Sequence, residues 1–123
     1  MTNSTWTWMS GDSTAKHPGI YGEKGNGSPS NTPGSRFAPS GWYDSLNQEF
    51  WVFGGYGCGN DTEQGTTVVA VVAVSTLQFT GFHFAGALND LWRYRVSDST
   101  WTWMSGSPSV DQPGVYGAKG SAS

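Results

Sequence analysis

The chain has 123 residues, the size of one domain at most, and its net charge of −3 excludes the basic surface that nucleic-acid binding requires. Eighteen Gly and six Pro indicate many turns, and seven Trp, five Tyr and six Phe favour β-strands. The longest apolar run, residues 68–74, is shorter than the roughly 20 residues of a membrane-spanning helix, so no membrane span is expected.

One sequence of eight residues occurs twice. Residues 4–11 and 99–106 both read Ser-Thr-Trp-Thr-Trp-Met-Ser-Gly, at an offset of 95 (99 − 4 = 95). The same offset relates residues 18–25 to residues 113–120, which share the pattern Pro-Gly-x-Tyr-Gly-x-Lys-Gly. A fixed offset held across two motifs is typical of a repeat architecture.

The expected elements are strands joined by loops. Alternating or densely β-branched and aromatic residues predict strands, in chain order, at 5–9, 36–43, 50–53, one or two within 66–85, then 88–96 and 100–104. Gly, Pro, Ser and Asn predict long loops at 12–35 and 54–65, while 44–49 and 97–99 are short polar links. Gly54 and Gly55 are expected to end their strand. No segment has helical periodicity, so the sequence predicts an all-β fold.

Residues 36–104 carry three motifs in a fixed order. An apolar strand reaches Gly-Gly at residues 50–55, the pattern Asn-Asp-Leu-Trp-Arg-Tyr follows at 89–94, and a Trp stands at 101. In this order the motifs resemble a kelch repeat. The resemblance implies a β-propeller in which each repeat forms one four-stranded antiparallel blade. The residues expected to build the blade are Arg36, Gly54, Gly55, Asn89, Asp90, Trp92, Tyr94 and Trp101.

This interpretation divides the chain into three parts. Residues 1–35 hold an orphan strand of a preceding blade and a long loop, 36–104 form one blade, and 105–123 begin the next inter-blade loop. The offset of 95 exceeds the roughly 50 residues of a kelch repeat, and the apolar segment 66–85 is either an inserted hairpin or an error of the gene model. One blade cannot close a ring of four to eight, so we expect either a part of a larger propeller or self-association of copies of the chain.

The order of the strands indicates where partners bind. In an up-and-down blade the long loops all leave one end, and loops on a rigid scaffold commonly carry binding. The kelch resemblance also implies a partner-binding face there. The first hypothesis is therefore a non-catalytic module that binds a protein or a glycan. Tyr21, Tyr56 and Tyr116 are the candidate exposed aromatics, although the repeated motif around Tyr21 and Tyr116 favours a structural role for those two.

Two alternatives stay open, a purely structural repeat and a fragment of a secreted oxidase. The second follows from a resemblance to the central propeller of galactose-oxidase-like proteins, which implies a copper site and a Cys–Tyr crosslink. Tyr56 and Cys58 are close in sequence, but the family's motifs around its ligands are absent. His17 and His83 do not form a zinc spacing, so no catalytic residue, metal or cofactor is expected. The lone cysteine and the N-terminus, which lacks the features of a signal peptide, leave the compartment open.

Overall fold

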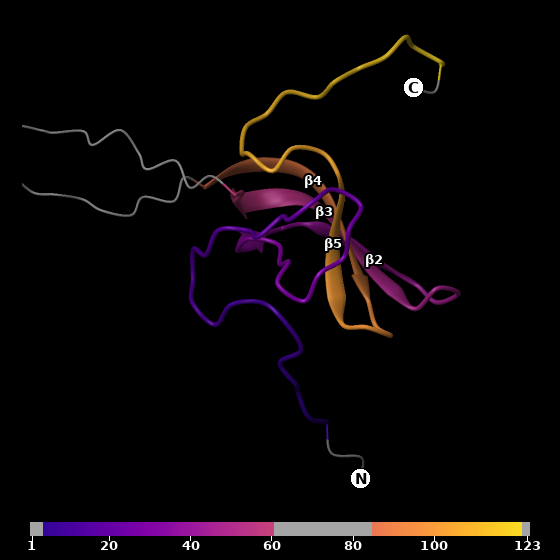
Figure 1. The fold of residues 1–123 in the computed structure, drawn as a ribbon. Coiled ribbons are helices and arrows are strands. Elements are labelled where there is room, and N and C mark those ends of the chain that lie inside the picture. Colours follow the sequence, from indigo (N-terminus) through magenta and orange to yellow (C-terminus); the bar gives the residue numbers. More distant parts are fainter. Residues whose placement is uncertain (1–3, 61–84, 122–123) are drawn as a thin grey trace, which may run out of the picture.

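The computed structural model of the chain describes residues 4–60 and 85–121. These residues contain no helix and form one open antiparallel sheet (Figure 1), so the all-β prediction is confirmed. Its strands are β1 (Arg36–Phe37), β2 (Ser40–Asp44), β3 (Glu49–Cys58), β4 (Ala85–Arg95) and β5 (Thr100–Ser105). Apart from Ala85, the expected insertion at 66–85 lies outside the described residues.

The sheet has four strand positions, because β1 and β2 both pair with β3. The remaining order is β3, β4, β5, and every pairing is antiparallel. The strand predicted at 36–43 is therefore divided in two. The break falls at Ala38, whose φ of 51° is left-handed, and at Pro39, which has no backbone N–H to donate to the sheet.

The prediction that Gly54 and Gly55 end their strand is wrong. β3 continues to Cys58 through an irregularity in its pairing with β4 between Phe53 and Gly55. Both glycines have left-handed φ, 62° and 98°, and a Cβ at Gly55 would lie 2.8 Å from the carbonyl oxygen of Phe37. The glycine pair bends the strand as a β-bulge does, and a neighbouring strand keeps it paired.

The two later strands agree with the sequence. β4 and β5 cover the predicted segments 88–96 and 100–104 to within a few residues. Along β4 buried residues alternate with more exposed ones, and Trp92 is completely buried. The strand predicted at 5–9, by contrast, is not formed. That segment has no sheet partner among the described residues, and a strand needs one for its backbone N–H and C=O groups.

The strand register assigns the side chains of the sheet to two faces. Directly opposed residues on paired strands point to the same side. One face, which we call the covered face, carries Phe50, Val52, Leu88, Asp90, Trp92, Tyr94, Trp101 and Trp103. The other, which we call the open face, carries Phe37, Trp42, Trp51, Phe53 and Tyr56.

The two ends of the sheet differ in their connections. The β2–β3 and β4–β5 turns are tight and lie side by side, since the Val96 amide donates to the Gln48 carbonyl at 3.2 Å. The long segments meet at the opposite end, where Gly19 donates to Gly59 and Asn60 donates to Pro108, each at 2.8 Å. We call these the turn end and the loop end.

Candidate functional site

A buried carboxylate holds the first long loop, residues 12–35, on the covered face of the sheet. We call this segment the first loop. Asp90 accepts two hydrogen bonds from the Arg36 guanidinium, at 2.7 and 2.9 Å. Its Oδ2 also accepts bonds from the Tyr21 hydroxyl at 2.5 Å and from Trp92 Nε1 at 2.7 Å. We call Tyr21, Arg36, Asp90 and Trp92 the Asp90 cluster. A buried charge is tolerated when it is paired and fully hydrogen-bonded. We therefore interpret the Asp90 cluster as a group that stabilises the fold.

Tyr21 has no free group to offer a ligand. Its ring lies 4.7 Å from that of Trp92 and 5.4 Å from that of Trp103, measured between centroids. Burial, and then the hydrogen bond and charge of Asp90, raise the pKa of the Tyr21 hydroxyl. The phenol therefore stays protonated as a donor to the carboxylate.

The rest of the first loop binds β5. The Gly25 amide donates to the Trp103 carbonyl at 2.8 Å, and the Ser28 amide to the Trp101 carbonyl at 3.3 Å. Lys24 Nζ stands 4.5 Å from the centroid of the Trp103 ring, a cation–π distance. The loop thereby protects part of the outer edge of β5, which would otherwise be open to pairing.

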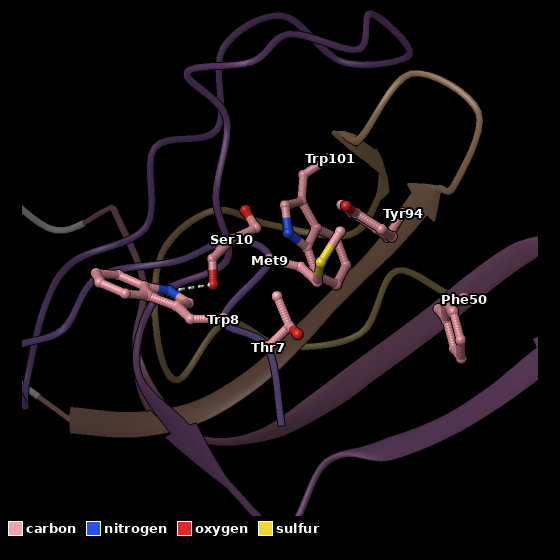
Figure 2. A pocket seen from close by; sticks show the side chains of 7 residues that line it. All are labelled: Thr7, Trp8, Met9, Ser10, Phe50, Tyr94 and Trp101. Carbon is pink, nitrogen blue, oxygen red and sulfur yellow. Dashed lines mark hydrogen bonds between the residues drawn. The ribbon is translucent and has the colours of Figure 1, made fainter. Parts of the chain in front are cut away.

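An open apolar hollow of about 490 Å³ lies between the N-terminal segment and the sheet (Figure 2). Thr7, Trp8, Met9 and Ser10 line it on one side and Phe50, Tyr94 and Trp101 on the other. Figure 2 shows the Trp8 indole turned away from Trp101, toward the Ser10 carbonyl to which it donates at 2.9 Å. The Tyr94 hydroxyl is buried and has no hydrogen-bond partner among the described residues. The hollow lies near the turn end, away from the predicted binding loops.

The open face carries exposed aromatic rings on rigid strands. Trp42 and Trp51 stack in parallel with centroids 5.9 Å apart, and Phe37 and Tyr56 lie 5.5 Å apart. Phe37 follows directly on the first loop, and Tyr56 is two residues from the end of β3. The Phe37–Tyr56 pair is therefore the exposed aromatic pair of the loop end.

The three candidate binding tyrosines have different environments. Tyr21 is not an exposed binding candidate, because only 4% of it is accessible and it is buried in the Asp90 cluster, in keeping with the structural role that the repeated motif favoured. Tyr56 is 47% exposed and Tyr116 is 91% exposed. Tyr56 and Tyr116 remain available for contact with a partner.

The eight predicted blade residues all lie in or beside the sheet. Arg36, Asp90 and Trp92 belong to the Asp90 cluster, and the two glycines form the irregularity of β3. Tyr94 and Trp101 are opposed on adjacent strands as expected, with ring centroids 5.1 Å apart. Asn89 holds the start of the C-terminal tail, since its Oδ1 accepts the Ser107 amide at 2.9 Å.

Groups with intrinsic chemical reactivity are few in the described part of the chain. Burial raises the pKa of the Cys58 thiol, although the charge of Lys16 lowers it, so the thiolate is disfavoured. Residues 4–60 and 85–121 contain no cluster of three or more His, Cys, Asp or Glu able to hold a metal ion. His83 lies outside the described residues, while His17 is close to Asp12 at 3.3 Å. Nor does the described chain include a helix that could cross a membrane.

Comparison with known proteins found no relative. No protein-family model, no curated protein and no solved structure matches the chain.

Sequence reasoning missed the open face and the hollow. Phe37 and Trp42 are five positions apart, so the continuous strand expected at 36–43 would place them on opposite faces, whereas the break at Ala38 puts both on the open face. The run at residues 50–53 was expected to be covered on both faces, whereas Phe50 and Phe53 are each nearly half exposed. Phe50 and Phe53 lie on opposite faces of β3, and an apolar run does not show by itself that each face is only partly covered.

Proposed function

We propose that the chain is a non-catalytic kelch-type repeat module that offers the loop end of its sheet to a protein or glycan partner. The strand order, the glycine pair within β3 and the pattern Asn-Asp-Leu-Trp-Arg-Tyr along β4 support the kelch-type assignment. The observation that carries the binding role is the exposed Phe37–Tyr56 pair beside the long segments.

Aromatic pairs of this kind suit both classes of partner. A flat ring fixed on a sheet loses little conformational entropy on binding, and its face stacks on a sugar or fills a groove of a protein. The Asp90 cluster ties the first loop to the sheet, so the loop end is pre-organised. Pre-organisation lowers the entropic cost of association.

The test compares two tyrosines at opposite ends of the sheet. Tyr56 and Tyr43 are 47% and 49% exposed, and each contacts one Phe ring. A glycan array and an affinity capture are run with the intact chain, with Y56A and with Y43A. We expect Y56A to weaken capture about tenfold or more, as for loss of a binding hot spot, and Y43A to leave it unchanged.

Two outcomes contradict the proposal. In the first, Y56A and Y43A lose capture equally, which means either that binding lies elsewhere or that both variants unfold. Circular dichroism of each variant distinguishes these two explanations. An empty array together with an empty capture favours the alternative of a purely structural repeat.

A further inference from the structure

Residues 113–120 of the C-terminal tail repeat the turns of the docked first loop, but their tyrosine is exposed. We call residues 18–25 the docking loop and residues 113–120 the tail copy. At matching positions their neighbourhoods share left-handed backbone angles, with φ of 58° at Lys16 and 54° at Asp111, and 83° at both Gly25 and Gly120. A Cβ at Gly19 would lie 2.6 Å from the Tyr21 ring, and a Cβ at Gly114 would lie 2.9 Å from the Tyr116 ring. The two copies therefore share the turns on either side of the motif, although Gly22 has a left-handed φ of 62° and its counterpart Gly117 does not.

The surroundings of the two copies are opposite. Tyr21 is enclosed by the Asp90 cluster, whereas Tyr116 and Val115 are almost entirely exposed. Figure 1 shows the tail, in yellow, running away from the sheet. Tyr116 stands in the same motif as the buried Tyr21 but is exposed to solvent. We infer that it binds a surface like the one that holds Tyr21, on another molecule.

The tail copy keeps the groups through which residues 18–25 contact the cluster and β5. Tyr116 matches the ring and hydroxyl of Tyr21, and Gly120 matches the amide that bonds the Trp103 carbonyl. Lys119 matches Lys24, which lies over the Trp103 ring. The changed positions are Ile20 to Val115 and Glu23 to Ala118. Ile20 is half exposed, and Glu23 is exposed and bonds Asn26 rather than the sheet.

We propose that the tail copy of one chain docks in the Asp90 cluster of a second copy of this chain, in the place of that copy's Tyr21. The Tyr116 hydroxyl then donates to the partner carboxylate, and the ring packs between two tryptophans. The surfaces used differ on the two chains, so the contact is head-to-tail and propagates to a ring or an open chain. This link is independent of ligand binding at Phe37 and Tyr56.

When the tail copy of one chain replaces the docking loop of another, the contacts that form are similar to the contacts that are lost. The exchange is therefore close to balanced in contact energy. The covalently attached loop has the advantage of a high effective concentration, so the exchange depends on protein concentration. A small change in either tyrosine therefore shifts the equilibrium. A hydrogen bond to a charged group corresponds to about tenfold or more in an equilibrium constant.

The test uses two matched variants that remove only a hydroxyl, Y21F and Y116F, with the double variant and the intact chain. Sedimentation equilibrium over a concentration series gives the association constant of each. We expect Y21F to raise it about tenfold, Y116F to lower it about tenfold, and the double variant to restore it. Identical masses for all four chains at every concentration, or shifts of Y21F and Y116F in the same direction, overturn the proposal.

A second measurement does not depend on those tyrosines. A benzophenone amino acid replaces Val115, and this chain is mixed with a ¹⁵N-labelled chain before irradiation. We expect adducts that join labelled and unlabelled chains around Thr32, because Val115 corresponds to Ile20 and Ile20 pairs with Thr32. Adducts confined to single chains, or mixed adducts scattered over the surface, overturn the proposal.

Discussion

Residues 4–11 and 99–106 have the same eight amino acids, but the structure makes a strand of the second copy alone. Residues 100–105 form β5 beside β4, and Trp101 and Trp103 are partly buried on the covered face. In the first copy Trp6 is fully exposed and Trp8 and Met9 are mostly exposed. The difference comes from the neighbours, since the sequences are identical.

The C-terminal end of each copy nevertheless has the same local conformation. Trp8 Nε1 donates to the Ser10 carbonyl at 2.9 Å, and Trp103 Nε1 donates to the Ser105 carbonyl at 2.8 Å. Gly11 and Gly106 both have left-handed φ, 95° and 80°. Short-range interactions thus shape the end of the segment, while pairing and burial require β4. Three changes test how far this separation holds, in order of decreasing effect.

The largest contrast is expected between Y21A and Y116A, the tyrosines that follow the two copies. Y21A removes a buried ring and a donor to Asp90, which costs about 3 kcal/mol of the free energy of unfolding. Y116A removes a ring exposed to solvent and changes it by no more than about 0.5 kcal/mol. Urea unfolding at low protein concentration, followed by tryptophan fluorescence, measures both. Equal effects would mean that the tail copy is already docked.

A smaller contrast is expected between W103A and W8A, which carry the same change at repeat-related positions. Trp103 lies opposite Trp92 and contacts Tyr21 edge-on, so its loss costs about 2 kcal/mol, less than for a fully buried ring. W8A lies in the unpaired copy and changes the free energy of unfolding by about 0.5 kcal/mol or less. The same urea titration applies. A large effect of W8A would show that the first copy contributes to stability in spite of being unpaired.

The smallest effect is expected in alkali. The pKa of Tyr21 is raised in the folded chain from the ordinary 10.0, so the unfolded chain loses this proton first as the pH rises. The stabilisation is complete below pH 10 and declines above it. Between pH 10 and 11 the free energy of unfolding of the intact chain should fall by about 1 kcal/mol more than that of Y21F. Parallel pH profiles for the two chains would contradict the bond between Tyr21 and Asp90.

Local patterns were sufficient for much of the sheet. Dense β-branched and aromatic residues identified β4 and β5 and the centre of β3, and the repeat offset located the two related loops. Along β4 the alternation of side chains places Trp92 and Tyr94 on one face and Leu91 on the other. These features follow from the alternation of side chains along a strand, which is a property of the sequence.

Other features depended on residues distant in the chain. Gly54 and Gly55 look like a strand end, but β4 keeps the backbone paired beyond them. The repeated motif favoured a structural role for Tyr21, but not its partner, because Asp90, which accepts a hydrogen bond from its hydroxyl, is 69 residues away in the chain.

By itself the sequence determined the all-β composition, the later strands and the bend at the end of each repeated octapeptide, because these depend on propensity and short-range hydrogen bonds. The tertiary structure decided which octapeptide is a strand and which of Tyr21 and Tyr116 is buried. A strand needs a neighbour for its backbone groups and a ring needs a surface to displace water from. Because the two copies have the same sequence, the sequence alone does not show which copy has a neighbouring strand or a covering surface.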